Sequence, residues 1–215
     1  MSWQRFLYSH GILSIVSVGT WLALVVSGSL ILIHYASQPG ATMDASSKWP
    51  ADTHLSRSAQ HPTLIMFAHP HCPCSRASVD ELADIVSECQ GSVDVQIVFY
   101  CPNLTDANWK ETSLVRQAAQ LSKAVIFFDC NAQESQSFRA TISGQVMLFS
   151  PTGELLFNGG ITASRGHVGE SYGKSSVISL LRTPPQTILA STTAQRFPTF
   201  GCTLVQPEIA SGAVN

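Results

Sequence analysis

The sequence predicts an α/β domain with a mixed β-sheet and flanking helices, preceded by a single transmembrane helix. An uncharged apolar stretch near the N-terminus is long enough to cross a bilayer. Beyond residue 61, short apolar runs typical of buried strands alternate with segments of helical periodicity. Such alternation indicates parallel strands covered by helices, and a later pair of strand-like runs around a Pro/Gly turn adds an antiparallel hairpin.

The apolar stretch from Gly11 to Ile33 carries no charged residue. At about 1.5 Å per residue it spans the roughly 30 Å of a hydrocarbon core, whereas a cleaved signal peptide has a shorter apolar core of about 7–15 residues. We therefore expect an uncleaved anchor in the lipid bilayer. Arg5 precedes the span and Lys48 is the first basic residue after it, so the positive-inside rule places residues 1–10 in the cytoplasm. The remaining chain is then periplasmic or otherwise extracytoplasmic, on a single-pass protein of the inner (plasma) membrane.

Charge and cysteine content narrow the class of partner and the compartment. The 215 residues have a formal net charge of -2 and a charged fraction of 12%. No Lys/Arg cluster is present to neutralise phosphates, which argues against nucleic acid as a partner. All six cysteines follow the apolar span, and an exported domain lies where disulfides form and persist. The paired C-x-x-C spacing of a structural zinc site is absent from the sequence.

The rest of the chain divides at changes in composition. Residues 34–61 are rich in Ala, Ser, Asp and Pro without an apolar period, which predicts a solvated linker. We expect the folded domain at residues 62–182 and a C-terminal extension at residues 183–215 that no periodic pattern places. The predicted elements of the domain are, in order, a strand 63–68, a helix from residue 75, a strand 93–100, a helix 107–119, a strand 125–128, hairpin strands 145–149 and 154–158, and a helix 174–181.

Local signals support these elements. Thr63–Ala68 is almost wholly apolar, the pattern of a strand buried on both faces. Apolar residues recur from Val79 to Val86 at positions i, i+3, i+4 and i+7, which is one face of a helix. Gly91-Ser92 ends that helix before the next strand, and Ser150–Gly153 supplies the hairpin turn. The order of elements therefore predicts three parallel strands followed by an antiparallel pair.

The densest group of reactive side chains follows the first strand, in the run His69–Arg76 (HPHCPCSR). Right-handed crossovers bring the carboxyl ends of parallel strands to one edge of the sheet. Cys101 and Cys130 follow the second and third predicted strands, so they are expected at the same edge. Ligand and catalytic sites of open α/β sheets lie at this edge, and we expect the functional site there.

Cys72 is the candidate nucleophile of this run. A cysteine near a helix N-terminus meets unpaired N–H groups and the positive end of the helix dipole, which favour the reactive thiolate. His69 and His71 would strengthen this effect when protonated. Pro73 fits the first helical turn, where its missing N–H costs nothing.

The partner of Cys72 is left open by the sequence. A Cys72–Cys74 bridge closes a very small ring, and strained geometry makes such a bond easier to reduce. Cys101, Cys130 and Cys202 are the further candidates for the resolving thiol. For Cys101 and Cys130 the alternative is a structural disulfide or a pair of packed thiols, and Cys202 is an alternative structural staple.

The order of elements and the run Phe67–Ala77 (FAHPHCPCSRA) resemble the thioredoxin superfamily, in particular its membrane-anchored TlpA-like branch with the pattern F-W-A-x-W-C-x-P-C-R-x. The chain also resembles the RedB-like proteins of that superfamily. The resemblance covers residues 62–182 and implies a thioredoxin-like fold. It also implies a thiol–disulfide oxidoreductase without a cofactor, protein thiols or disulfides as substrates, and a membrane redox partner.

The residues depart from the family pattern at several positions. Cys72 falls on the family's first, nucleophilic cysteine, but Ser75 falls on the second, and Cys74 lies one place early. Arg76 matches the family's arginine and is otherwise a solvated residue of the first helical turn. Ile142–Gly144 replaces the cis-proline that the family places before the hairpin, facing the active site.

Two other functions remain open on the sequence. His69, His71, Cys72 and Cys74 offer soft ligands suited to Cu(I) or zinc, and His167 could add an imidazole. This set would suit a copper chaperone resembling the thioredoxin-like Sco family, although that family uses C-x-x-x-C and a histidine just before the hairpin. The other alternative is a non-catalytic, membrane-tethered interaction domain.

Overall fold

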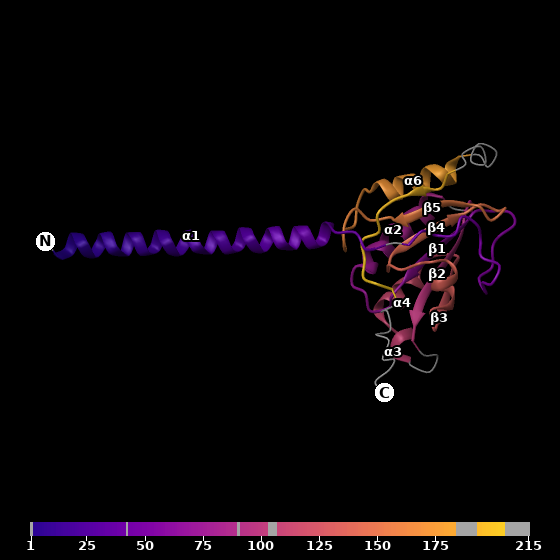
Figure 1. Ribbon diagram of the computed structural model, residues 1–215, viewed down its shortest axis with the longest axis horizontal. Coiled ribbons are helices and arrows are strands. Elements are labelled where there is room, and N and C mark those ends of the chain that lie inside the picture. Colours follow the sequence, from indigo (N-terminus) through magenta and orange to yellow (C-terminus); the bar gives the residue numbers. More distant parts are fainter. Residues whose placement is uncertain (1, 42, 90, 103–106, 184–192, 205–215) are drawn as a thin grey trace, which may run out of the picture. The chain divides into compact units, whose positions relative to one another are not determined.

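The computed structural model of the protein (Figure 1) describes residues 2–41, 43–89, 91–102, 107–183 and 193–204. The chain forms two compact units, residues 1–38 and 39–215. Parts of the predicted C-terminal extension, residues 184–192 and 205–215, lie outside the described residues.

The first unit is one long helix, α1 (Ser2–Ser37), which includes the predicted span and continues beyond both of its ends. Residues 13–37 of this helix are long and apolar enough to cross a membrane, by length and composition. Its polar side chains do not conflict with such a setting, because the hydroxyls of Ser17 and Thr20 donate to backbone carbonyls four residues earlier.

The second unit is built on a six-stranded mixed sheet of order β3-β2-β1-β4-β5-β6. The strands β1, β2 and β3 run parallel, and β4 and β5 form the antiparallel hairpin beside β1. This arrangement confirms the predicted mixed sheet. The strands are β1 (Thr63–Ala68), β2 (Asp94–Cys101), β3 (Ala124–Cys130), β4 (Gln145–Phe149), β5 (Leu155–Gly160) and β6 (Gln195–Arg196).

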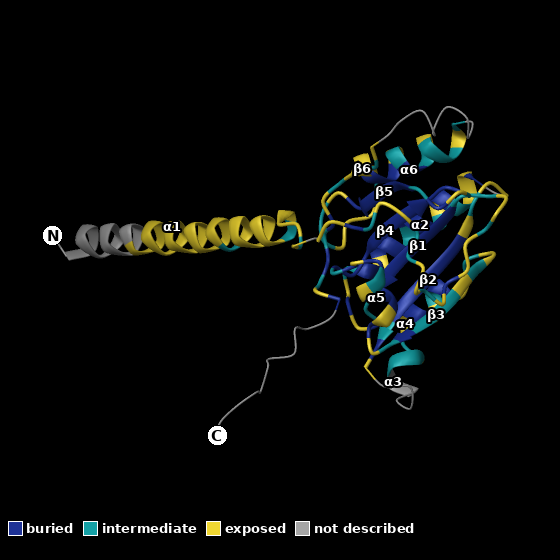
Figure 2. Ribbon diagram, turned by 45° about the vertical axis from the view of Figure 1, so that its right-hand side comes forward, coloured by how far each residue is buried: buried dark blue, intermediate teal, exposed yellow. Residues whose placement is uncertain are grey.

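Both faces of the central strand are buried, as the apolar run predicts. Leu64, Met66 and Ala68 face one core cluster, together with residues of α2 (Ser75–Glu88), α4 (Ser113–Ala118) and α6 (Tyr172–Arg182). Ile65 and Phe67 face the other cluster, because successive side chains of a strand point to opposite faces. Figure 2 shows the resulting buried band along β1, β4 and β5.

The predicted helix over residues 107–119 is wrong as a single element. The chain forms α3 (Ala107–Lys110) and α4, separated at Thr112. Thr112 has an extended backbone, and its hydroxyl accepts a hydrogen bond from the Val115 N–H at 3.2 Å. This N-cap starts a new helix, because the Thr112 hydroxyl pairs with the Val115 N–H. In a continuous helix that N–H would instead bond to a backbone carbonyl four residues earlier.

The short polar helix α5 (Gln133–Ser137), which follows β3, has no apolar period and was not predicted. The Asp129 carboxylate accepts hydrogen bonds from the Glu134 and Ser135 N–H groups, both at 2.9 Å. Because Asp129 is almost wholly buried, these bonds also satisfy a polar group that would otherwise be costly to bury.

The stretch expected to be a solvated linker packs against the sheet from residue 45 onward. Trp49 lies edge-on to Phe138 and Phe149, with ring centroids 5.2 Å apart in each pair, and Leu55 is buried in the same cluster. The backbone and ring of His54 donate to the buried Glu134 carboxylate. Isolated apolar residues without a period carry no strand or helix signal, yet here they cover the second face of the sheet.

The described part of the C-terminal extension, residues 193–204 (the tail), also lies against the domain. Its β6 pairs in parallel with β5, and the Phe197 N–H donates to the Asn158 carbonyl at 3.1 Å. The close approach depends on Gly159, where a Cβ atom would stand 2.5 Å from the Phe197 carbonyl oxygen. The tail then continues past the start of β4 and brings Cys202 to the carboxyl end of β1, as described next.

Candidate functional site

The loop between β1 and α2 presents the predicted motif at the carboxyl edge of the sheet. Tight turns shape it: the Cys72 N–H donates to the His69 carbonyl at 3.0 Å, and the Ser75 N–H donates to the Cys72 carbonyl at 3.2 Å. α2 begins at Ser75, with Cys74 as its N-cap residue. Cys72 is 4% exposed, so its sulfur lies beneath other groups and not in open solvent.

Cys202 of the tail lies against Cys72. The two Sγ atoms are 2.7 Å apart, although 130 residues separate them in the chain. Cys74 completes a cluster in which all three Sγ atoms lie within 4.8 Å of one another. All three cysteines are free thiols in this structure, Cys72 buried and the other two half-buried.

Backbone pairing fixes the tail at this position. The Ser143 N–H donates to the Cys202 carbonyl at 2.8 Å, and the Leu204 N–H donates to the Thr141 carbonyl at 2.7 Å. Ile142 and Thr203 form an antiparallel bridge between these bonds. The segment at residues 141–143 therefore holds the tail as an extended strand, with its cysteine against the candidate nucleophile.

Two buried serines lie behind Cys72: Ser75 forms hydrogen bonds to Cys72, and Ser143 contacts Ser75. The Ser75 and Ser143 Oγ atoms are 2.6 Å apart, and Ser143 Oγ accepts the His69 N–H at 2.7 Å. Ser75 occupies the position of the family's second cysteine, where a hydroxyl forms hydrogen bonds but no disulfide. Ser143 lies in the segment that replaces the family's cis-proline, and no cis peptide bond occurs in the described residues.

These neighbours determine the protonation of Cys72. Burial raises the pKa of its thiol, but hydrogen bonds from Cys202 and Ser75 to the thiolate outweigh burial, and the pKa is lowered overall. The pKa of Cys202 is raised to about 12, first by burial and then by the adjacent Cys72. When the pair carries a single proton, that proton therefore lies on Cys202 and the negative charge on Cys72.

Cys74 and Arg165 complete the surroundings. Burial, followed by the charge on Cys72, raises the pKa of Cys74, while the Arg165 guanidinium opposes this rise. Arg165 also donates to the Gly201 carbonyl, next to Cys202. Sequence patterns do not single out Arg165, which lies in a glycine-containing loop distant from the motif in the sequence.

The two histidines of the motif belong to an aromatic cluster and not to the sulfur cluster. The ring of His69 stacks on Tyr100 with centroids 5.8 Å apart, and Trp109 lies edge-on to both His69 and His71. Burial and the neighbouring His71 lower the pKa of His69. A lowered pKa disfavours the charged form of His69, so the effect of its charge on the Cys72 thiolate stays a prediction.

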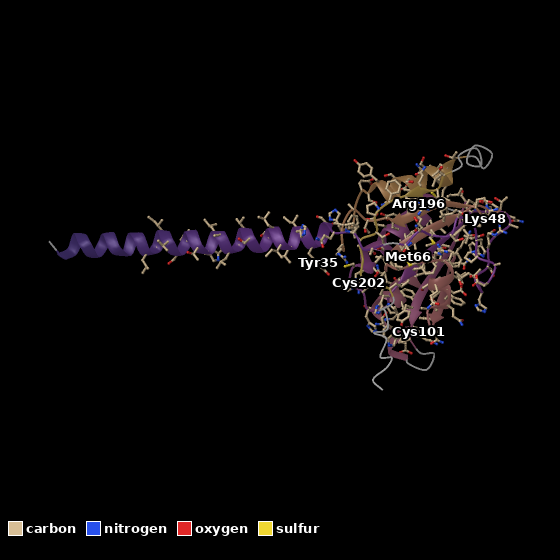
Figure 3. All side chains as sticks on the ribbon, in the orientation of Figure 1. Tyr35, Lys48, Met66, Cys101, Arg196 and Cys202 are labelled. Carbon is tan, nitrogen blue, oxygen red and sulfur yellow. The ribbon has the colours of Figure 1, made fainter. Side chains whose placement is uncertain are left out.

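Cys101 and Cys130 form a second, separate pair. They are register partners at the ends of the parallel strands β2 and β3, with Sγ atoms 3.0 Å apart. Burial and the adjacent Cys101 raise the pKa of Cys130 to about 11. Figure 3 shows Cys101 and Cys202 in different parts of the domain, so this pair does not take part in the cluster around Cys72.

The remaining predicted site residues are exposed and lie outside the sulfur cluster. Pro73 is exposed beside the sulfur cluster, and Arg76 is exposed and donates to Gln117 and Ser113 of the neighbouring helical segment. His167 is exposed in its loop. Among the described residues, the group able to hold a metal contains none of the histidines that the sequence suggested as ligands.

The comparisons with known proteins concern the fold. The sequence matches no protein-family model, and no curated protein matches it either. Among solved structures, an uncharacterised conserved protein from Geobacillus kaustophilus is similar at 17% identity and a TM-score of 0.53, covering 81% of this chain and 95% of that chain. A hypothetical protein from Sinorhizobium meliloti 1021 is similar at 16% identity and a TM-score of 0.52, covering 78% and 97%.

A secreted Mycobacterium tuberculosis disulfide oxidoreductase, described as homologous to E. coli DsbE, matches at 11% identity and a TM-score of 0.41, covering 58% of this chain and 81% of that chain. The strand order, the parallel core and the following hairpin define the class of fold. The chain has the α/β thioredoxin-like fold, with a mixed sheet and a long apolar helix before it. The fold class predicted from the sequence is confirmed.

Proposed function

We propose that the protein is a membrane-anchored, exported thiol–disulfide oxidoreductase in which Cys72 is the nucleophile and Cys202 the resolving thiol. The observation that carries this proposal is the 2.7 Å separation of their sulfur atoms, with the pKa of Cys72 lowered. The resemblance to TlpA-like and RedB-like proteins and the apolar helix α1 support the same function and location.

Exchange proceeds in two balanced steps in the reductive direction. The Cys72 thiolate attacks one sulfur of a substrate disulfide, a Cys72–substrate bond forms, and the other substrate sulfur leaves and takes up a proton. The Cys202 thiol then loses its proton and attacks Cys72, and the second substrate thiol leaves. The substrate gains two electrons, the Cys72–Cys202 disulfide forms, and a dithiol redox partner returns two electrons. The reverse sequence oxidises a substrate dithiol.

The proton on Cys202 does not block the second step. The pKa of Cys202 is raised first by burial and then by Cys72. Once Cys72 is bonded to substrate it carries no charge, and this second cause disappears. Cys202 then ionises more readily at the moment when its thiolate is needed as the attacking group.

Cys202 suits the resolving role better than the other candidates. A Cys72–Cys74 bridge would close a strained ring, whereas Cys202 belongs to an independent segment that approaches Cys72 from outside the motif. Cys101 and Cys130 face each other at another part of the edge, and we propose that they form a structural disulfide in the exported protein.

The docked tail supports a proposal for how a protein substrate binds. Its backbone pairs with residues 141–143 as an added strand, with Cys202 directed at Cys72. An extended, cysteine-containing segment of a substrate would use the same backbone bonds, a mode of recognition that depends on main-chain pairing. Because Cys72 is 4% exposed beneath the tail, the tail must move aside before substrate enters.

Trapping of mixed disulfides tests the proposal. The full chain carrying Cys202→Ser, expressed in bacterial cells, should accumulate disulfide-linked adducts on non-reducing gels, because the second step is blocked. Adding Cys72→Ser should remove the adducts. Cys89→Ser is the matched control, since Cys89 is a buried cysteine outside the cluster, and it should trap nothing.

Two outcomes contradict the proposal. Adducts that accumulate with Cys74→Ser and not with Cys202→Ser would make Cys74 the resolving thiol. If neither variant traps a partner and the purified wild-type chain does not reduce insulin disulfides, the oxidoreductase function itself is wrong.

A further inference from the structure

We propose that the reduced protein binds one Cu(I) ion between the sulfur atoms of Cys72, Cys74 and Cys202. These three Sγ atoms lie within 4.8 Å of one another, and they come from two segments, the motif loop and the tail. The proposal rests on this cluster and goes beyond the proposed oxidoreductase function, with which it shares two cysteines.

The dimensions of the cluster suit a three-coordinate ion. Metal–thiolate bonds of about 2.3 Å arranged in a triangle place the sulfur atoms roughly 4 Å from one another. The 4.8 Å limit of the cluster includes that spacing. The sulfur atoms of Cys72 and Cys202 are 2.7 Å apart, so they must separate to roughly 4 Å to bind the ion. A small shift of the tail is enough for this.

The ligand set favours Cu(I) over zinc. Thiolates are soft ligands that select Cu(I), zinc or iron–sulfur clusters, and structural zinc requires four ligands. Among the residues that the structure describes, no imidazole, carboxylate or fourth thiol joins the cluster. This composition differs from the His/Cys set suggested by the sequence, because His69 and His71 pack with Trp109 instead.

The surroundings of the cluster favour a negatively charged metal–thiolate centre, and they leave the cluster open to an entering ion. Three thiolates and one monovalent cation carry a net charge of two minus, and the Arg165 guanidinium acts electrostatically on both Cys74 and Cys202. Cys74 and Cys202 are half-buried, which leaves a route for the ion, while Cys72 is nearly covered.

Redox state controls whether this site exists. Binding requires the three thiols to lose their protons to solvent, since only the thiolates are ligands. Forming the Cys72–Cys202 disulfide removes two of the three ligands and releases the ion. Metal binding and disulfide formation are therefore mutually exclusive states of the same cluster.

The test uses the full chain in detergent, reduced and kept free of oxygen. Cu(I) is titrated against bicinchoninate, a chromophoric competitor, and X-ray absorption counts the sulfur ligands. We expect one equivalent of Cu(I) with three Cu–S bonds. Cys202→Ser and Cys74→Ser should each weaken binding by more than about 100-fold, because even changes outside the ligand shell cost about 10–100-fold. Cys89→Ser is the matched control and should bind as the wild type does.

Three results would overturn the metal site. The reduced chain could fail to bind Cu(I) although its circular dichroism shows the native fold. Cys89→Ser could lose as much Cu(I) affinity as Cys202→Ser does, or His69→Ala or His71→Ala could lose Cu(I) affinity. A chain that reduces disulfides without binding copper refutes this inference alone. A chain that binds copper through three sulfurs without any disulfide exchange refutes the proposed function alone.

Discussion

At the scale of single residues, Ser75 shows how the site departs from a two-cysteine motif. It stands where the family has its second cysteine, is fully buried, and lies 2.6 Å from Ser143 through their hydroxyl oxygens. Its hydrogen bonds to Cys72 help lower the pKa of that thiol against the opposing effect of burial. We therefore propose that Ser75 is a positioning residue that stabilises the thiolate, and that the second redox sulfur is that of Cys202.

Replacing Ser75 by alanine should raise the pKa of Cys72. A hydrogen bond to a charged group contributes about 1.5–3 kcal/mol, so losing the bond from Ser75 removes one of the causes that lower the pKa of the Cys72 thiol. Because the pKa of Cys72 is lowered in the wild type, its thiolate persists as the pH falls, and reactivity disappears only below that lowered pKa. The midpoint of the Cys72 alkylation profile, followed by mass spectrometry, should move to higher pH in Ser75→Ala.

Ser179→Ala is the control for this change, since Ser179 is exposed on α6, away from the motif. It should leave the midpoint in place. An unchanged midpoint in Ser75→Ala would show that the serine does not influence the thiolate.

At the scale of secondary-structure elements, the tail is the segment that completes the site. It is bound mainly through its backbone, to β5 and to residues 141–143. Gly201 is required at the closest point, where a Cβ atom would stand 1.9 Å from the Ser143 carbonyl oxygen. The position of Cys202 therefore depends on a residue that has no side chain.

Gly201→Ala should detach the tail from the nucleophile. Overpacking costs about 1–3 kcal/mol, so the ratio of docked to undocked tail should fall about fivefold or more. In the reduced full chain, alkylation of Cys202 should become faster and the yield of the Cys72–Cys202 disulfide lower.

Gly19→Ala is the matched substitution, because a Cβ atom added at Gly19 in α1 would meet no other part of the protein within 4 Å beyond its own helix backbone. It should behave as the wild type does. A wild-type rate of Cys202 alkylation in Gly201→Ala would mean that the tail is not held as the structure shows.

The elements that sequence predicts well are those with a local signal. The apolar run of β1, the helical period of α2 and the Pro/Gly turn of the hairpin each lie within a few residues, and all three elements occur where expected. The Thr112 cap that divides α3 from α4 and the Asp129 carboxylate that begins α5 act through one or a few side-chain hydrogen bonds to the backbone, which periodicity does not detect.

The candidate site was likewise predictable only where the sequence carries a local signal. Cys72 follows from its place between a strand and a helix, and Cys202 was one of several candidates for its partner. Its docking depends on backbone bonds to residues about 60 positions earlier in the chain, such as Ser143. Backbone groups are the same in every residue, so a sequence pattern gives no sign of such pairing.

At the scale of the whole molecule, the proposed function requires a thiol site outside the cytoplasm and attached to the membrane. The α1 helix is long and apolar enough to provide that attachment, and every cysteine follows it. A dithiol that cycles in an oxidising compartment needs a supply of electrons or of oxidant, and an anchor keeps it near a membrane redox partner.

The full chain should therefore fractionate with membranes and resist extraction by alkaline carbonate. A chain lacking residues 2–37 should be soluble, because the apolar span is gone. N-terminal sequencing of the full chain should find its start unchanged. A soluble protein that begins near Tyr35-Ala36-Ser37 would instead identify the span as a cleaved signal peptide.

The identity of the redox pair is tested most directly by mapping the disulfide of the oxidised full chain. Trypsin releases residues 58–76, which contain Cys72 and Cys74, and residues 197–215, which contain Cys202. After mild oxidation we expect a disulfide from Cys72 to Cys202 to join these two peptides, and reduction should separate them. A Cys72–Cys74 loop within the first peptide, with Cys202 still free to alkylate, would contradict this expectation.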